Sequence, residues 1–248
     1  MTVNATTIIT IMAIQDMAMM GQNLFIIQIK NLLKNSRNKL LIFIMKYSKI
    51  FVIGDSHTGT LHGKFSHIDV FPMGPVTMYD TINGFMEKLI NLLKSQEKIS
   101  DSGLYVFSAG EIDARCLIYN QIHEKGRQED EVINTLVDSY VKKIKTLFKD
   151  VAILSLPPPV NFFTGGYEKQ INCLNYPFIG PDEDRNRYVF KINKRLKEKC
   201  SEHNIIYLNI YDSYKNEQGY LIKEFSDGNV HIARGGNIDQ ILKELELV

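Results

Sequence analysis

The sequence has few cysteines, no excess of either charge and no long uninterrupted apolar run. Its 3 cysteines are an odd number and do not have the spacing of a metal site. They are Cys116, Cys173 and Cys200. A disulfide framework is therefore not expected, and free thiols indicate the cytoplasm or another reducing compartment.

The formal net charge of +1 argues against one class of partner. Proteins that bind nucleic acid rely on clustered lysine and arginine to neutralise phosphates, and this chain has no such excess. We therefore expect no nucleic-acid partner. No pattern in the sequence specifies the oligomeric state.

The first part of the chain lacks basic residues, since 1–29 contain neither lysine nor arginine. A secretory signal needs a basic segment before its apolar one, so none is predicted. A membrane span needs about 20 mostly apolar residues, and this stretch is interrupted by Gln15, Asp16, Gln22, Asn23 and Gln28. Because Met45 directly precedes a strand-like segment, we expect residues 1–44 to be a poorly packed extension or a non-native start. Residues 45–248 are expected to form one domain.

From Lys46 onward, short apolar segments alternate with helical patterns. The apolar segments are continuous and rich in β-branched residues, which is typical of strands buried on both faces of a parallel sheet. They lie at 49–54, 68–71, 103–108, 151–156 and 205–210. Helical periodicity occurs at 80–95, 129–148, 182–202 and from about 236 to the end. This alternation predicts a three-layer α/β/α sandwich with a parallel sheet.

Polar clusters follow the strands at the edge where open parallel sheets bind ligands. The first strand ends in the sequence GDSH, which contains Ser56, and the third ends in SAGEIDAR, residues 108–115. Near the C-terminus, FSDGNVHIA supplies Asp227 and His231. A serine, a histidine and a carboxylate at one edge suit acyl transfer: the serine attacks, the imidazole takes its proton, and the carboxylate orients the imidazole.

These motifs resemble those of the SGNH/GDSL hydrolases, from about residue 46 to the end. That family has a flavodoxin-like three-layer fold. Its first motif, Gly-Asp-Ser, matches residues 54–56, so the resemblance gives Ser56 the nucleophile role. Gly74 is the nearest match to the glycine of the second motif. The third motif, Gly-x-Asn-Asp, corresponds to residues 110–113, and the last, Asp-x-x-His, is approximated by Asp227 and His231.

Two departures from the family pattern concern the chemistry. Ile112 stands at the position of the family's oxyanion-hole asparagine, and loss of one such donor typically lowers the rate by about 100- to 1,000-fold. Arg115 is a candidate replacement. One additional residue also separates Asp227 from His231, which changes the direction expected for the carboxylate.

The combination of GDSH with GEIDxR resembles a subgroup of these proteins linked to polysaccharide modification. In that subgroup Glu111 and Arg115 look like parts of the site. Glu111 would pair with Arg115 or His57, or accept a sugar hydroxyl. The resemblance therefore implies an acylated carbohydrate, or another small ester, as substrate.

The prediction is a serine-dependent esterase or O-acyltransferase that works through an acyl-enzyme. Ser56 would be the nucleophile, His231 the base and Asp227 its orienting carboxylate. Oxyanion-hole or substrate-binding roles are predicted for Asp55, His57, Gly74, Gly110, Glu111, Asp113 and Arg115. This chemistry requires no metal and no organic cofactor.

Two alternatives stay open at this point. A non-catalytic carbohydrate-binding domain of the same fold would explain the missing asparagine and the altered Asp/His spacing. A metallophosphoesterase would use Asp55 and His57 as metal ligands. The second is weakened because the chain has no Gly-Asn-His motif and no Asp-x-x-Asp spacing after the third strand.

Overall fold

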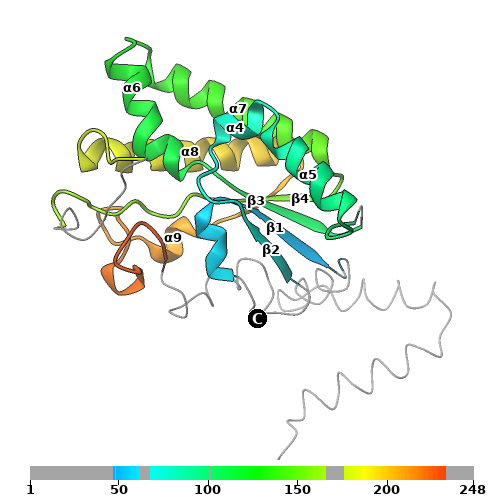
Figure 1. Ribbon diagram of the computed structural model, residues 1–248. Helices are drawn as coiled ribbons and strands as arrows, with labels where there is room; N and C mark the ends of the chain where they lie inside the picture. The colour runs from blue at the N-terminus through cyan, green and yellow to red at the C-terminus, as the bar shows by residue number, and fades with distance from the viewer. Residues whose placement is uncertain (1–46, 48, 62–67, 101, 166–175, 233–248) are drawn as a thin grey trace, which may run out of the picture. The chain divides into compact units, whose positions relative to one another are not determined.

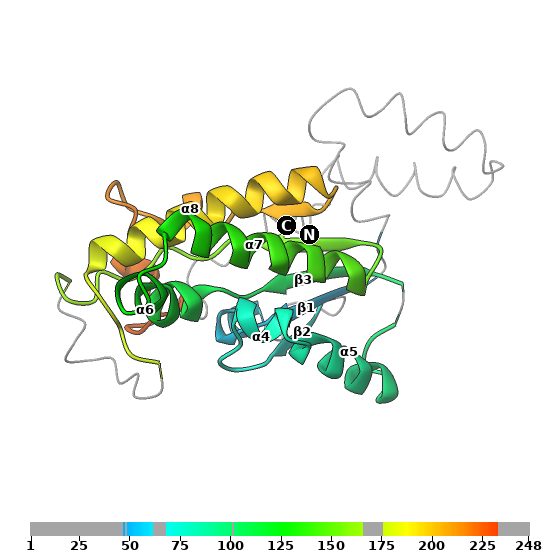
Figure 2. The ribbon, with the colours of Figure 1, turned by 90° about the horizontal axis from the view of Figure 1, so that it is seen from above.

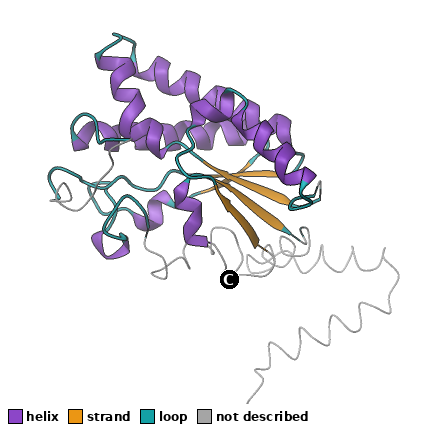
Figure 3. Cartoon of the chain, in the orientation of Figure 1, coloured by secondary structure: helices purple, strands orange, loops and turns teal. Residues whose placement is uncertain are grey.

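The fold is built on one parallel sheet with five strands, in the order β2-β1-β3-β4-β5. The computed structural model describes residues 47, 49–61, 68–100, 102–165 and 176–232. The strands are β1 Ile50–Gly54, β2 Ile68–Pro72, β3 Leu104–Ser108, β4 Val151–Leu154 and β5 Ile206–Leu208. All five predicted strands and their parallel pairing are confirmed (Figure 3). The predicted extension 1–44 and the predicted last helix lie outside the described residues. The predicted boundary between the extension and the domain at 45–248 stays a prediction.

Helices connect successive strands. The α-helices are α4 Met78–Ile82, α5 Phe85–Ser95, α6 Ile118–His123, α7 Glu129–Leu147, α8 Asp182–Glu202 and α9 Tyr211–Tyr214. The described residues also form the 3-10 helix η1 Ser56–Leu61, the π-helix η2 Asp113–Leu117 and the 3-10 helix η4 Lys223–Phe225. Helices α5, α7 and α8 lie over the same face of the sheet, and α7 runs beside α8 (Figures 1 and 2). Right-handed crossovers in one direction along the sheet produce this placement.

The helix predicted at 80–95 is two helices, which corrects the expectation from periodicity. The break falls at Gly84, whose φ of +92° is left-handed. Glycine adopts such a conformation without the steric penalty of a β-carbon, so the chain turns there and restarts as α5. The helices at 129–148 and 182–202 are confirmed as α7 and α8.

The core explains why the strands read as unbroken apolar runs. Every residue of β1, β3 and β4 is buried. Side chains such as Phe107 and Ile153 pack with Val137 of α7 and Ile192 of α8 in one hydrophobic cluster. The core therefore fixes the sheet, and the carboxyl ends of its strands emerge at one edge.

None of the helices in the described ranges combines the length and the apolar character needed to cross a membrane.

Candidate active site

The first strand delivers Ser56 to solvent through a turn that requires glycine. Gly54 pairs with Ser108 of β3, and a β-carbon on Gly54 would lie 2.2 Å from the Ser108 carbonyl oxygen. The next amide, that of Asp55, donates to the same oxygen at 3.0 Å. Asp55 and His57 are buried, whereas Ser56 between them is exposed. The close approach of two strand ends thus presents one serine outward.

Ser56, His231 and Asp227 lie in hydrogen-bonding sequence. The Ser56 Oγ is 2.8 Å from Nε2 of His231, and Nδ1 of the same ring is 3.1 Å from Oδ2 of Asp227. The serine comes from η1 at the end of β1, and the other two residues come from one turn near the end of the described chain. This is the arrangement of a nucleophile, a base and an orienting carboxylate.

The additional residue between Asp227 and His231 is absorbed by a tight turn. The Asp227 amide donates to the His231 carbonyl at 3.0 Å, and Gly228 adopts a left-handed φ of +82°. Asp227 Oδ1 accepts from the Asn229 amide at 2.8 Å. The spacing therefore leaves both side chains on the same side of the turn, which sequence spacing alone did not indicate.

The environment favours the neutral form of His231. Burial lowers the pKa of its imidazole below the usual 6.5, and the neighbouring His57 lowers it further. Asp227 acts in the opposite direction through its charge and its hydrogen bond, without reversing the result. A neutral imidazole is the form that accepts a proton from serine.

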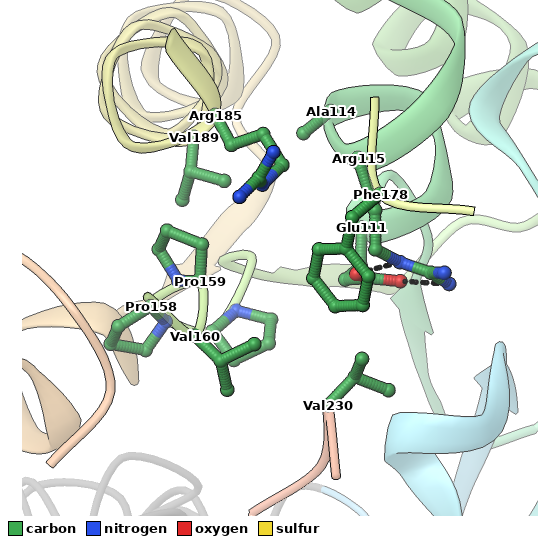
Figure 4. A pocket seen from close by; sticks show the side chains of 11 residues that line it. Glu111, Ala114, Arg115, Pro158, Pro159, Val160, Phe178, Arg185, Val189 and Val230 are labelled. Carbon is green, nitrogen blue, oxygen red and sulfur yellow. Dashed lines mark hydrogen bonds and ion pairs between the residues drawn. The ribbon is translucent and has the colours of Figure 1, made fainter. Parts of the chain in front are cut away.

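Next to Ser56, His231 and Asp227 lies a less exposed cluster of ionisable side chains. It comprises Asp55, His57 and Arg115, which are buried, and Glu111, which is largely buried. Nε of Arg115 lies 2.6 Å from Oε1 of Glu111, and its Nη2 lies 3.1 Å from Oε2 (Figure 4). Oε2 of Glu111 is also 3.9 Å from Nε2 of His57. The cluster joins the turn after β3 to the turn that carries Ser56.

Opposing charges decide the protonation of this cluster. Burial would raise the pKa of Glu111, but Arg115 and His57 outweigh it and lower the value to about 2. Burial raises the pKa of Asp55 to about 6. Burial would lower the pKa of His57, yet Asp55 and Glu111 reverse this, and the pKa lies above the usual 6.5.

Asp113 links the third motif to the loop that holds Gly74. Its Oδ2 accepts from the Met78 amide at 2.7 Å, at the start of α4. Burial raises the pKa of Asp113 to about 7. Gly74 has a left-handed φ of +72°, and a β-carbon on Gly110 would meet Met78 at 2.7 Å. Both glycines are therefore required by the backbone where the sequence placed them.

Neither Ile112 nor Arg115 is placed to donate a hydrogen bond directly to an oxyanion. Ile112 is buried and offers no polar side chain. Arg115 donates to Glu111 and, through Nη1, to the Tyr176 carbonyl. Its guanidinium also lies over the Phe178 ring, 5.2 Å from the centroid. These contacts aim Arg115 at Glu111 and at the loop, which favours action through Glu111 over direct donation to an oxyanion.

No family model and no curated protein matches the sequence. Solved structures do resemble the fold. A protein from Streptococcus pneumonia, provisionally described as a platelet activating factor, has a TM-score of 0.53 at 15% identity, covering 91% of this chain and 98% of its own. A GDSL-like lipase from Bacteroides thetaiotaomicron has a TM-score of 0.51 at 15% identity, covering 80% of this chain and 84% of its own.

A provisionally assigned acylhydrolase from Bacteroides fragilis has a TM-score of 0.50 at 18% identity, with coverage of 80% of this chain and 88% of its own. The chain has the SGNH/GDSL hydrolase fold. The predicted three-layer α/β/α class is thereby confirmed. At these identities the likeness establishes the fold, and the roles of individual residues rest on the geometry above.

A small hollow lies beside the cluster of ionisable side chains. Its volume is about 10 Å³, and it is lined by Pro157–Pro159, Val160, Phe178, Val230 and the Glu111–Arg115 pair (Figure 4). Val230, which lines the hollow, directly precedes His231 in the sequence. Only a group the size of a water molecule or a methyl fits such a volume.

A second buried ion pair holds the loop around this hollow, and the sequence analysis missed it. Arg185 pairs with Asp182 at the start of α8. Oδ2 of Asp182 accepts from the amides of Phe163 and Thr164 at 3.0 and 2.8 Å. The local signal is the Pro-Asp-Glu sequence at 181–183, which is typical of the beginning of a helix and does not by itself indicate an ion pair.

Within the described ranges, no three His, Cys, Asp or Glu side chains are arranged to hold one metal ion. The alternative that makes Asp55 and His57 metal ligands therefore finds no third ligand among those residues.

Proposed function

We propose that this protein is a serine-dependent esterase or acyltransferase in which Ser56 is the nucleophile. The observation that carries the proposal is the pair of contacts from Ser56 to His231 and from His231 to Asp227, at 2.8 and 3.1 Å. The fold shared with a GDSL-like lipase and an acylhydrolase supports ester chemistry.

The proposed reaction has two halves. Ser56 Oγ attacks the acyl carbon while its proton moves to Nε2 of His231, and Asp227 stabilises the resulting imidazolium. The tetrahedral intermediate collapses when the alcohol leaves with the proton of His231, which forms the acyl-enzyme. Water, or a second hydroxyl, then loses a proton to His231 and attacks the acyl carbon, and Ser56 departs with that proton. Hydrolysis and acyl transfer differ only in this acceptor.

We propose the backbone amides of Ser56 and Gly74 as donors to the oxyanion. Each belongs to a turn fixed by neighbouring contacts: the Met73 amide donates to the Gly54 carbonyl at 2.8 Å, and Asp113 anchors the start of α4. Fixed backbone donors stabilise developing negative charge without reorganisation. Arg115 would contribute through Glu111.

We propose a small ester, or the acyl group of an acylated carbohydrate, as substrate. Aromatic side chains of the loop after β4 support sugar binding: Phe162 stacks on Phe178 with centroids 3.9 Å apart, and Phe163 is exposed. Exposed aromatic faces are common contacts for apolar surfaces of ligands. Because Ile112 replaces an asparagine donor, a binding domain without catalysis is the second candidate.

Hydrolysis of 4-nitrophenyl acetate by wild type, Ser56→Ala and Ser201→Ala tests the proposal. Ser201 is an exposed serine near the end of α8 and provides a matched control. We expect hydrolysis by wild type and Ser201→Ala, and none above background by Ser56→Ala. Equal rates in all three proteins would contradict the proposed nucleophile, and no rate in any of them would favour the binding domain.

A further inference from the structure

His57 is not needed by the reaction as written, yet it is buried directly beside the proposed base. The centroids of the His57 and His231 rings are 4.8 Å apart, with the planes tilted by 55°. Only 8% of His57 is exposed. A histidine in this position affects its neighbour mainly through whether it carries a charge, because two cations at such a distance repel each other.

The residues around His57 favour its charged form. Oδ1 of Asp55 accepts from the His57 amide at 3.1 Å, and Oε2 of Glu111 lies 3.9 Å from the Nε2 atom of the ring. Arg115 lies on the far side of Glu111 and is bound to it through both carboxylate oxygens. With a neutral His57, Arg115 would be the one cation of this cluster, opposite Glu111 and, above its pKa of about 6, ionised Asp55. Buried charge without a partner is unfavourable, so a second cation in the cluster is favoured.

Resting on the proposed function, we propose that His57 is a positively charged positioning residue, held by Asp55 and Glu111, that keeps His231 neutral and ready to accept the serine proton. The charged groups that act on His231 are Asp227 on its own turn, His57 on η1 and, more weakly, Glu111 after β3. Of these, His57 alone disfavours protonation of His231.

The expected consequence is a base that works in mildly acidic solution. Burial and His57 both lower the pKa of His231, and the two nearby carboxylates do not restore it. The acid limb of the reaction should therefore lie below pH 6.5. If His57 were replaced by an uncharged residue, the pKa of His231 should rise and the limb should move to higher pH.

Histidine NMR titrations test this directly and need no substrate. The chain has 6 histidines, which single His→Gln variants assign. We expect the proton affinity of His231 to rise at least about threefold in His57→Gln, and to stay unchanged in His123→Gln. His123 provides the control because its ring is partly exposed and stacks on Tyr119. An unchanged titration of His231 in His57→Gln would overturn the proposal.

A second variant and the wild-type titration keep the test decisive if His57→Gln does not fold. In Glu111→Gln, His57 loses the carboxylate that lies 3.9 Å from its ring, so its own pKa should fall. If neither variant folds, as judged by circular dichroism, the wild type still decides. A His57 pKa above 6.5 supports the proposal, and one below 6.5 overturns it.

The rate at which a fluorophosphonate probe labels the protein, measured against pH, separates this proposal from the proposed function. Absence of labelling in wild type at every pH would contradict the serine mechanism while the NMR result still stands. Labelling with the same acid limb in wild type and His57→Gln would uphold the mechanism and overturn the role of His57.

Discussion

Two polar layers occur at the carboxyl edge of the sheet, and they differ in their exposure to solvent. The outer layer, Ser56, Asp227 and His231, is held by side-chain contacts of 2.8 and 3.1 Å at the surface. The inner layer, Asp55, His57, Glu111 and Arg115, is largely buried and tied to the ends of β1 and β3. In the proposed mechanism the outer layer moves a proton, and we propose that the inner layer sets the electrostatic field in which that proton moves.

Two carboxyls on one turn show how the inner field is set. Glu111 and Asp113 are both shielded from solvent, but the pKa of Glu111 is lowered to about 2 and that of Asp113 is raised to about 7. Glu111 faces Arg115 and His57. Asp113 faces backbone amides and another carboxylate, Asp80. Burial acts on both in the same direction, so the facing cations decide the difference.

The largest expected effect is on activity, from the outer layer. His231→Gln removes the proposed base and should lower kcat by about 10⁴- to 10⁶-fold. The free energy of unfolding should change by less than about 1 kcal/mol, since the ring is only partly buried. Ester hydrolysis and urea denaturation measure the two quantities. Activity within tenfold of wild type would remove His231 from the mechanism.

A substitution in the inner layer should lower the free energy of unfolding. Arg115→Met leaves Glu111 without its bidentate partner in a buried site, and breaking such a pair lowers the free energy of unfolding by about 3–5 kcal/mol. Arg127→Met is the control, because the Arg127–Glu131 pair is exposed and is expected to contribute less than about 1 kcal/mol. Equal effects of the two substitutions in urea denaturation would mean that the inner layer does not stabilise the fold.

Asp113 should affect stability through a dependence on pH. Its pKa in the folded protein, about 7, exceeds the ordinary 3.8, so the folded state holds a proton that the unfolded state releases. Stability therefore falls as pH rises from about 4 to 7, by at most about 1.4 kcal/mol per pH unit. Asp113→Asn should remove this component.

The measurement compares unfolding free energies of wild type and Asp113→Asn at pH 4.5 and 7.5. The variant should gain on wild type as pH rises. Glu217→Gln, at an exposed carboxylate, supplies the control. A difference between Asp113→Asn and wild type that does not vary with pH would show that Asp113 is ionised throughout.

The sheet could be predicted from the sequence because buried parallel strands leave a local signature. The central strands β1 and β3 are mostly apolar and buried at every position, and each is followed by a polar turn. The break at Gly84 and the π-helical turn at Asp113–Leu117 were not predicted. Both are deviations within helical stretches, where hydrophobic periodicity continues across the irregularity.

The site was predictable as a set of residues and not as a geometry. The spacing between Asp227 and His231 did not predict contact between their side chains. The tight turn that brings them together contains Gly228, whose φ is left-handed. The contact of Arg115 with the Tyr176 carbonyl and that of Asp182 with the Phe163 amide join segments from separate loops. Such contacts follow from the packed fold and leave no local pattern in the sequence.

The most direct test of the central claim is the mass of the intact protein after treatment with a fluorophosphonate probe, with and without EDTA. An activated serine predicts one adduct on wild type, unaffected by EDTA, and no adduct on Ser56→Ala. An adduct of equal yield on Ser56→Ala, or none on wild type, would contradict the assignment of Ser56 as nucleophile.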